Sequence, residues 1–199
     1  MGSTRKDTRR RGEALTGAIY RATLDEPART SFEELSFEKI ATAVGTGKAA
    51  LYRRWFGPAE LVLATLGDPA AGFGHVPDPP HTGTLRGDLI ELLTHLARIL
   101  DEPHGRALRP LIAHRHRHPE LFERVYGSVL RPHLELLLAV LREAATRGQA
   151  APERATARVA SVGPRMITLQ AWEHDRVDPG EVEAIVDEIL LPLVTPHRP

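Results

Sequence analysis

The chain of 199 residues contains no cysteine, which excludes disulfide bonds and thiolate metal sites. Its longest unbroken apolar run, Leu136 to Leu141, is far shorter than the ~18 residues that a transmembrane helix needs. No apolar segment of signal-peptide length follows the basic N-terminus, because Glu13, Gly17 and Arg21 interrupt it. We therefore expect a soluble, cytoplasmic protein with no membrane partner. The apolar share of 42% is enough for a substantial core.

The chain also lacks a net charge, since 26 Lys and Arg stand against 26 Asp and Glu. The charge is unevenly distributed, however. Residues 1–56 hold 11 basic and 7 acidic side chains, a balance of +4, and the rest hold 15 and 19, a balance of −4. Most of the N-terminal excess lies in Arg5, Lys6, Arg9, Arg10 and Arg11. This segment fits two interpretations equally, a disordered solvated tail or an arm that follows phosphates.

Strand patterns are nearly absent, because β-branched and aromatic residues never alternate with polar ones over a strand length. Helical spacing recurs instead, and it predicts an all-α fold of about nine helices. Pro58, Pro103 and Pro119 each stand where a helix can begin, and Pro132 is expected to kink a long helix. The clearest predicted helical segments are a helix around Leu15 to Ala22, then Ser36 to Val44, Lys48 to Phe56, Ala59 to Leu66, Leu85 to Leu100, Pro119 to Arg147, and a last helix that starts at Asp178-Pro179-Gly180-Glu181.

A segment rich in glycine and proline separates a small N-terminal part from a larger C-terminal part. Residues 67–83 hold four Gly and four Pro among 17 positions, a composition typical of a loop or hinge. No repeat of solenoid length occurs in the chain. We expect two functional domains, residues 1–57 and residues 58–199, with the hinge inside the second.

Two short helices joined by a tight turn are predicted between Ser36 and Trp55. Ile40 and Leu51 are apolar at spacings that let the two helices share a core. Gly45 lies where the chain needs a left-handed turn, which glycine adopts without strain. Ser36 is a suitable cap for the first helix.

The second of these helices is predicted to begin near Thr46-Gly47-Lys48. Its first turn carries small residues and a lysine, so it can lie deep in a DNA major groove. This pattern indicates a helix-turn-helix, although helical hairpins of other kinds share parts of it.

The stretch resembles the TetR/AcrR family of transcriptional regulators. The residues that carry the resemblance are, in register, Leu35-Ser36-Phe37-Glu38, Ile40-Ala41, Val44-Gly45, Lys48, Leu51-Tyr52 and Trp55. A looser similarity extends over Gly83 to Asp88, His118 to Leu121, Arg147-Gly148 and Val162 to Pro164. The resemblance implies a DNA-binding domain in residues 1–57 and an effector-binding and dimerisation domain in residues 58–199. It also implies a homodimeric repressor of a palindromic operator, with no enzymatic activity and no cofactor.

The resemblance further implies which residues touch DNA. Relatives often carry a lysine just after the motif's aromatic residue, whereas this chain has Gly57-Pro58 there, so one phosphate contact is missing. Trp55 is expected to pack in the core of the small domain, and either Arg53 or Arg54 to add a phosphate contact. The implied DNA-binding set is Ser36, Thr46, Gly47, Lys48, Ala49, Tyr52 and Arg53.

Two further sets belong to the larger domain. An unidentified small-molecule effector is expected among its middle helices, although apolar residues there fit a plain core as well; the candidates are Leu92, His95, Leu96, Ile99, Ile112, Tyr126, Val129, Met166 and Trp172. The last helix carries an apolar stripe that either packs within its own chain or pairs with residues 153–175 in a four-helix dimer interface. That stripe is Val182, Ile185, Val186, Ile189, Leu190 and Leu193.

A histidine-rich stretch offers an alternative function. His114 and His118 would face one metal ion if a helix continued through them, with His116 between them. Interleaved arginines and the following Pro119 favour a basic cluster over a metal site. We therefore predict no metal site and keep a metal-responsive helical sensor as the alternative. A small helical enzyme is a third possibility, which lacks support because no catalytic motif occurs.

Overall fold

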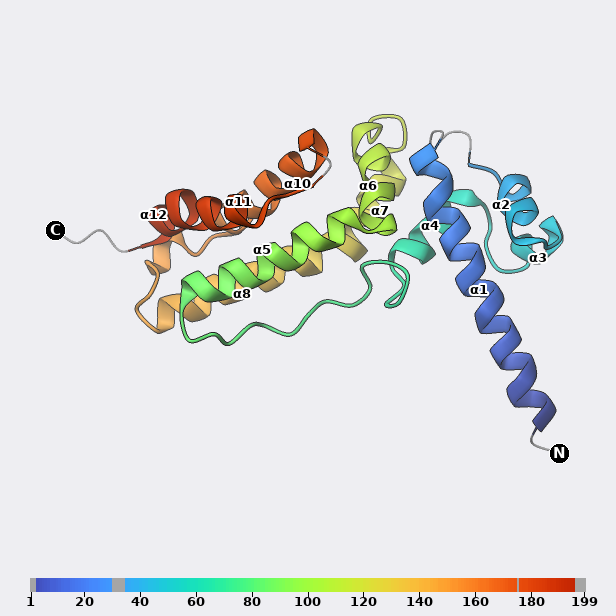
Figure 1. The fold of residues 1–199 in the computed structure, drawn as a ribbon, viewed down its shortest axis with the longest axis horizontal. Helices are drawn as coiled ribbons and strands as arrows, with labels where there is room; N and C mark the ends of the chain where they lie inside the picture. Colours follow the sequence, from blue (N-terminus) through green and yellow to red (C-terminus); the bar gives the residue numbers. More distant parts are fainter. Residues whose placement is uncertain (1–2, 30–34, 175, 196–199) are drawn as a thin grey trace. The chain divides into compact units, whose positions relative to one another are not determined.

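The computed structural model describes residues 3–29, 35–174 and 176–195. Every regular element in these ranges is helical, which confirms the predicted all-α class (Figure 1). Counted as uninterrupted runs of helical backbone, the described residues form ten helices and one separate 3-10 turn, close to the predicted number of about nine. None of the described helices has both the length and the apolar character needed to cross a membrane.

The chain folds into two compact units, which we call unit 1 and unit 2. Unit 1 comprises residues 1–75 and 103–129, and unit 2 comprises residues 76–102 and 130–199. The first boundary falls inside the Gly- and Pro-rich segment 67–83. The predicted boundary between residues 57 and 58 separates a DNA-binding from an effector-binding domain, whereas the two units are defined by packing. That boundary therefore stays a prediction.

Unit 1 is built around its first helix, which packs against three others. Ile19, 1% exposed, and Leu24, 4% exposed, form the buried side of this helix. The basic segment that sequence left open as tail or arm lies within this helix. The helices of unit 1 are α1 (Ser3–Arg29), α2 (Phe37–Val44), α3 (Lys48–Tyr52), α4 (Pro58–Leu66), α6 (Pro103–Ala113) and α7 (Pro119–Val125); α1 contacts α2, α4 and α6, and α4 contacts α7.

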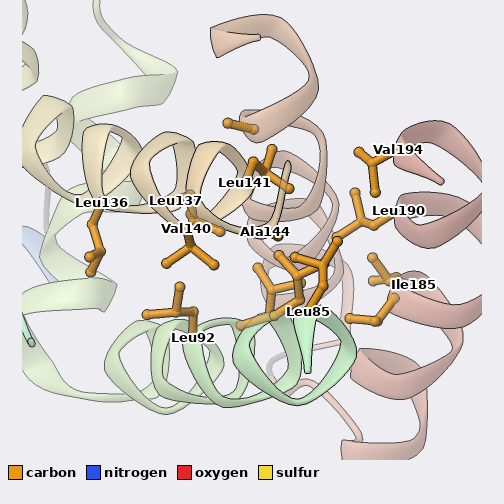
Figure 2. Close-up of a cluster of buried hydrophobic side chains, with 14 of the residues drawn as sticks. Leu85, Leu92, Leu136, Leu137, Val140, Leu141, Ala144, Ile185, Leu190 and Val194 are labelled. Carbon is orange, nitrogen blue, oxygen red and sulfur yellow. The ribbon is translucent and has the colours of Figure 1, made fainter. Parts of the chain in front are cut away.

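Unit 2 buries one large aliphatic core between α5, α8 and the helical run that ends the described chain. Its elements are α5 (Leu85–Asp101), α8 (Arg131–Thr146), the 3-10 turn η3 (Pro152–Arg154), α9 (Ala157–Ala160), α10 (Val162–His174), α11 (Pro179–Ala184), the π-helical turn η4 (Ile185–Leu190) and α12 (Leu191–Val194). We refer to α11, η4 and α12 together as the last helix. Figure 2 shows Ile185 and Leu190 of the last helix directed at side chains of α5 and α8.

Glycine permits a close approach in this core. A Cβ atom on Gly163 of α10 would lie 2.9 Å from Leu190 Cδ1 and 3.0 Å from Leu93 Cδ1. Because real Cβ atoms essentially never approach other atoms closer than 3.0 Å, a larger residue would force the ends of these leucine side chains to shift, and glycine lets α10, α5 and the last helix meet without that shift.

Several helix ends fall where local chemistry predicts them. The Ser36 hydroxyl accepts a hydrogen bond from Lys39 N at 3.2 Å, and the Asp178 carboxylate accepts one from Gly180 N at 2.8 Å. Gly45 has φ of 67°, the left-handed conformation predicted for the turn. These contacts satisfy backbone groups that a helix end leaves without intrahelical partners.

Two predicted helices differ from the observed ones. The segment predicted from Lys48 to Phe56 ends at Tyr52, because the amides of Arg54 and Trp55 both donate to Leu51 O and close the helix. The long helix predicted from Pro119 contains a π-helical turn, η2 (Tyr126–Leu130), directly before α8. Pro132 lacks an amide proton, which explains why the regular hydrogen-bond ladder is disturbed at this point.

Candidate nucleic-acid interface

The turn between α2 and α3 fixes one face of α3 against the protein and leaves the other in solvent. Ile40 and Leu51 are completely buried, and Thr46 N donates to Ala41 O at 2.9 Å across the turn. Lys48 and Tyr52 on α3 are exposed, with Tyr52 56% exposed. The buried pair therefore determines which side chains of α3 a ligand can reach.

The structure brings most of the predicted DNA-binding residues together on this exposed face. Gly47, Lys48, Ala49, Tyr52 and Arg53 are exposed, and Thr46 is half-buried at the start of α3. Ser36 is half-buried and its hydroxyl is engaged in capping α2. Small residues beside a lysine and a tyrosine let a helix approach a polyanion closely.

Lys48 and Tyr52 form a small cluster with two residues of α2. The Tyr52 ring meets the buried Phe37 edge to face at a centroid distance of 4.8 Å, which holds Tyr52 in place. Lys48 Nζ lies 5.9 Å from the centre of the Tyr52 ring and 3.8 Å from Glu38 Oε2. Both charged side chains are at least half exposed, so the ion pair is weak and Lys48 can exchange Glu38 for a phosphate.

Arg54, one of the two arginines considered for a phosphate contact, makes a contact within the protein instead. Its guanidinium donates to Thr16 Oγ1 at 2.6 Å, and the Thr16 hydroxyl in turn donates to Gly12 O at 2.9 Å. Trp55 is half-buried, with its ring 6.0 Å from that of Tyr20 on α1. Arg54 and Trp55 thus attach the residues that follow α3 to α1. Partial burial of Tyr20 in this contact raises the pKa of its hydroxyl above the ordinary value.

Sequence analysis did not predict the Arg54–Thr16 and Lys48–Glu38 contacts. Both join residues of different elements, so neither follows from the spacing within one helix. Opposite charges on the two helices of the predicted motif were the available signal for the second pair.

The residues predicted for an effector pocket are divided between the two units. Leu92, His95, Leu96, Ile99, Met166 and Trp172 belong to unit 2, whereas Ile112, Tyr126 and Val129 belong to unit 1. His95 Nδ1 lies 3.2 Å from Arg98 Nη2, so the arginine donates to that nitrogen. The pocket assignment stays a prediction.

A small apolar cavity lies elsewhere in unit 2. Its volume is about 10 Å³, room for at most one water molecule. None of the nine predicted effector residues lines it. The lining residues are Leu89, Leu137, Leu141, Val159, Ala160, Leu190 and Val194.

Most of the apolar stripe on the last helix packs within its own chain. Val182, Ile185, Val186 and Leu190 are each less than 5% exposed and belong to the core of unit 2. Ile189 is half-buried and Leu193 is 38% exposed. The four buried side chains have no surface left for a partner, so pairing through the last helix, which stays a prediction, would use its other face.

The histidine-rich stretch does not lie on one helix. α6 ends at Ala113 and α7 begins at Pro119, so His114, His116 and His118 fall in the turn between them. The described residues contain no group of three or more histidine or acidic side chains arranged to hold a metal ion.

The fold and the exposed face of α3 define a helix-turn-helix protein built to bind DNA. Residues 79–189 match a family model described as the tetracyclin repressor-like C-terminal domain. Because the match covers more than half of the chain, the protein belongs to the TetR family of helix-turn-helix transcriptional regulators, which are not enzymes, and its partner is operator DNA.

Curated relatives agree with this membership. The chain is 27% identical over 186 residues to the DNA-binding transcriptional repressor TetR of Mycobacteroides abscessus, covering 94% of this chain and 97% of that one. It is also 27% identical over 165 residues to an uncharacterised HTH-type transcriptional regulator of Mycobacterium tuberculosis, covering 82% of this chain and 80% of the relative.

Solved structures share the fold. Salmonella enterica GusR superposes with a TM-score of 0.71 at 17% identity, covering 90% of this chain and 96% of that one. A TetR-family regulator from Mesorhizobium loti superposes with a TM-score of 0.66 at 18% identity, covering 93% and 98%.

Proposed function

We propose that this regulator is a repressor that binds a palindromic operator as a homodimer and leaves it when a small molecule binds. The observation that carries the proposal is the exposed face of α3, where Lys48, Tyr52 and Arg53 are accessible while Leu51 is completely buried. The relative named as a repressor in M. abscessus supports the direction of control. A regulator of this kind acts on the chromosome, so a cytoplasmic location is part of the proposal.

Lys48 and Arg53 neutralise phosphates in this proposal, and Tyr52 reaches the backbone or a base edge. Gly47 and Ala49 let α3 approach the groove floor. The basic positions 5, 6, 9, 10 and 11 fall within α1, and they add further phosphate contacts. Removing residues 1–8 is therefore expected to weaken DNA binding more at low salt than at high salt.

A dimer follows from the size of the reading element. α3 has five residues and reaches only a few base pairs, so two copies related by a two-fold axis are needed for a specific site. The exposed Leu169 of α10 and Leu193 of the last helix, with the half-buried Val162, Met166 and Ile189, offer an apolar outer surface in unit 2. We propose this outer surface as the seam, in place of the buried stripe.

Release by a small molecule requires that the ligand favours a conformation that does not fit DNA. The cavity in unit 2 is far below the several hundred Å³ that a drug-sized ligand occupies. A ligand bound at this cavity would have to part the packed helices of unit 2, and that movement is the change that we propose to be transmitted to the DNA-binding residues.

The proposal is tested by selecting DNA from a random duplex library with the purified protein and sequencing the bound fraction. We expect an inverted repeat whose half-sites lie on one face of the duplex, bound by two chains per duplex in analytical ultracentrifugation. Randomising one half-site should abolish specific binding. Recovery of a single asymmetric site bound by one chain would contradict the homodimer.

A further inference from the structure

Phe56 is the most exposed large apolar side chain among the described residues, at 97%. It follows Trp55, which packs on Tyr20, and precedes Gly57 at the start of α4. Leaving a phenylalanine ring fully in water forgoes the stabilisation that burial would give. Single exposed apolar residues are common on protein surfaces, so exposure alone assigns no role.

The position of Phe56 is fixed on both sides. The amides of Arg54 and Trp55 donate to Leu51 O at 2.9 and 3.0 Å, and Gly57 O accepts from Leu61 N at 3.2 Å. The Arg54–Thr16 and Tyr20–Trp55 contacts hold the residues before it on α1. Phe56 is therefore presented from an anchored connection, which lowers the entropy cost of using its ring in binding.

The surroundings of Phe56 select a polyanion as its partner. Arg53 and Arg54 are exposed just before it, and Tyr52 of the candidate interface is only four positions away. Phe56 thus follows closely in the chain on the residues of α3 that the proposed function places on DNA. A duplex offers both phosphates for the cations and apolar sugar surface for the ring.

We propose that Phe56 is a further DNA-contacting residue whose ring packs against a deoxyribose next to the phosphates that Arg53 neutralises. In helix-turn-helix proteins the N-terminal residues of the recognition helix reach the base edges. Phe56 lies four residues beyond the C-terminal end of α3, away from the N-terminal residues expected to reach base edges. The contact is independent of sequence and carries no charge, and it rests on the proposed DNA-binding face.

The test compares Phe56→Ala, Phe56→Leu and the control Pro79→Ala, which truncates an exposed apolar residue in the loop before α5 of unit 2. Dissociation constants are measured for a duplex selected by the wild-type protein and for a random duplex of equal length, at three salt concentrations. We expect Phe56→Ala to weaken binding to both duplexes roughly tenfold. The slope of log K against log salt should stay unchanged, because no counterions are released by an apolar contact.

Phe56→Leu should retain part of the affinity, and Pro79→Ala should bind both duplexes as the wild type does. Melting curves of both Phe56 variants should match the wild type, since the ring contributes nothing to the core. A folded Phe56→Ala protein that binds both duplexes normally would overturn the proposal. The proposal would also be overturned if Phe56→Ala lost affinity for the selected duplex only, and if replacing thymine by uracil in that duplex weakened wild-type binding equally. The ring would then contact the methyl group of a base and not a deoxyribose.

Failure of this proposal can be told apart from failure of the DNA-binding face. If Lys48→Ala also leaves both affinities unchanged, the face on which the proposal rests is wrong. If Lys48→Ala weakens binding while Phe56→Ala does not, the face stands and Phe56 has no part in it.

Discussion

The α2–α3 hairpin and the last helix were both prominent in the sequence, and the structure uses them in opposite ways. The hairpin buries Ile40 and Leu51 and leaves charged and aromatic residues in solvent. The last helix turns its apolar stripe inward, so that Ile185 and Leu190 complete the core of unit 2. One element is expected to matter for binding more than for stability, and the other for stability more than for binding.

The ion pairs of the α2–α3 hairpin and of the last helix also differ, one being long and the other short. On the last helix, Asp187 accepts two hydrogen bonds from Arg86 of α5, at 2.7 and 2.8 Å, and Glu183 accepts a third at 3.0 Å. On the hairpin, Lys48 and Glu38 stand 3.8 Å apart. A short bidentate pair fixes two elements together, whereas a long exposed pair leaves a cation available for another partner.

The largest expected effect is on the stability of unit 2. Leu190→Arg places a charge in an aliphatic core and should lower the free energy of unfolding by about 4 kcal/mol or more. Leu193→Arg is the matched control, because Leu193 lies on the same helix and is 38% exposed. Thermal melting followed by circular dichroism should show early unfolding for Leu190→Arg only.

The opposite pattern would break the comparison. A Leu190→Arg protein that stays helical and stable but becomes monomeric in sedimentation would return Leu190 to the dimer seam. Loss of the dimer in Leu193→Arg, at unchanged stability, is the result that the proposed seam on the outer surface predicts.

Gly163→Ala should have the next largest effect. The added methyl group would lie 2.9 Å from Leu190 Cδ1 and 3.0 Å from Leu93 Cδ1, so both side chains must move in a packed core. Overpacking of this kind costs about 1–3 kcal/mol, which chemical denaturation resolves. Gly127→Ala is a suitable control, because a Cβ atom there meets nothing within 4 Å. Equal stability of the two variants would show that α10 and the last helix are less tightly packed.

Sequence predicted several helix ends well because their determinants are local. Ser36, Gly45 and Asp178 each act through contacts within a few residues, and the structure shows all three in the predicted role. The early end of α3 was missed, because no breaker precedes Gly57 and the helix closes through Leu51 O instead. Periodicity likewise predicted that Leu190 faces something apolar.

Periodicity cannot say which apolar partner that is. The spacing of a stripe is the same whether it packs on α5 and α8 or on a second chain, so the inward orientation of Ile185 and Leu190 required the structure. The Arg54–Thr16 hydrogen bond and the exposure of Phe56 also depend on tertiary placement. Local propensity therefore predicted the elements, and packing determined which residues remain available for a site.

A third expected effect concerns DNA affinity alone. Lys48→Ala should weaken binding roughly tenfold for each half-site at about 0.1 M salt, and reduce the slope of log K against log salt by about 1 for each half-site. The loss should be similar for selected and random duplexes, and the melting temperature should stay as in the wild type. Glu38→Gln, which releases Lys48, should raise the affinity by about twofold. Unchanged binding in both variants would remove the hairpin from the DNA interface.

The smallest expected effect is the pH dependence of the Arg86–Asp187 pair. Hydrogen bonds from Arg86 hold the pKa of the Asp187 carboxyl below its ordinary value near 3.8, so the folded state favours the carboxylate. Such a group stabilises the fold fully above the unfolded pKa, and the contribution disappears as the pH falls through the lower folded pKa. Asp187→Asn should therefore melt slightly earlier than the wild type at pH 7 and together with it at pH 2. Glu188→Gln makes the same change in charge one residue further along and controls for net charge. If Asp187→Asn and Glu188→Gln melt alike at pH 7, the Arg86–Asp187 pair contributes nothing measurable to thermal stability. This pair and the long Lys48–Glu38 pair would then differ in geometry but not in their contribution to stability.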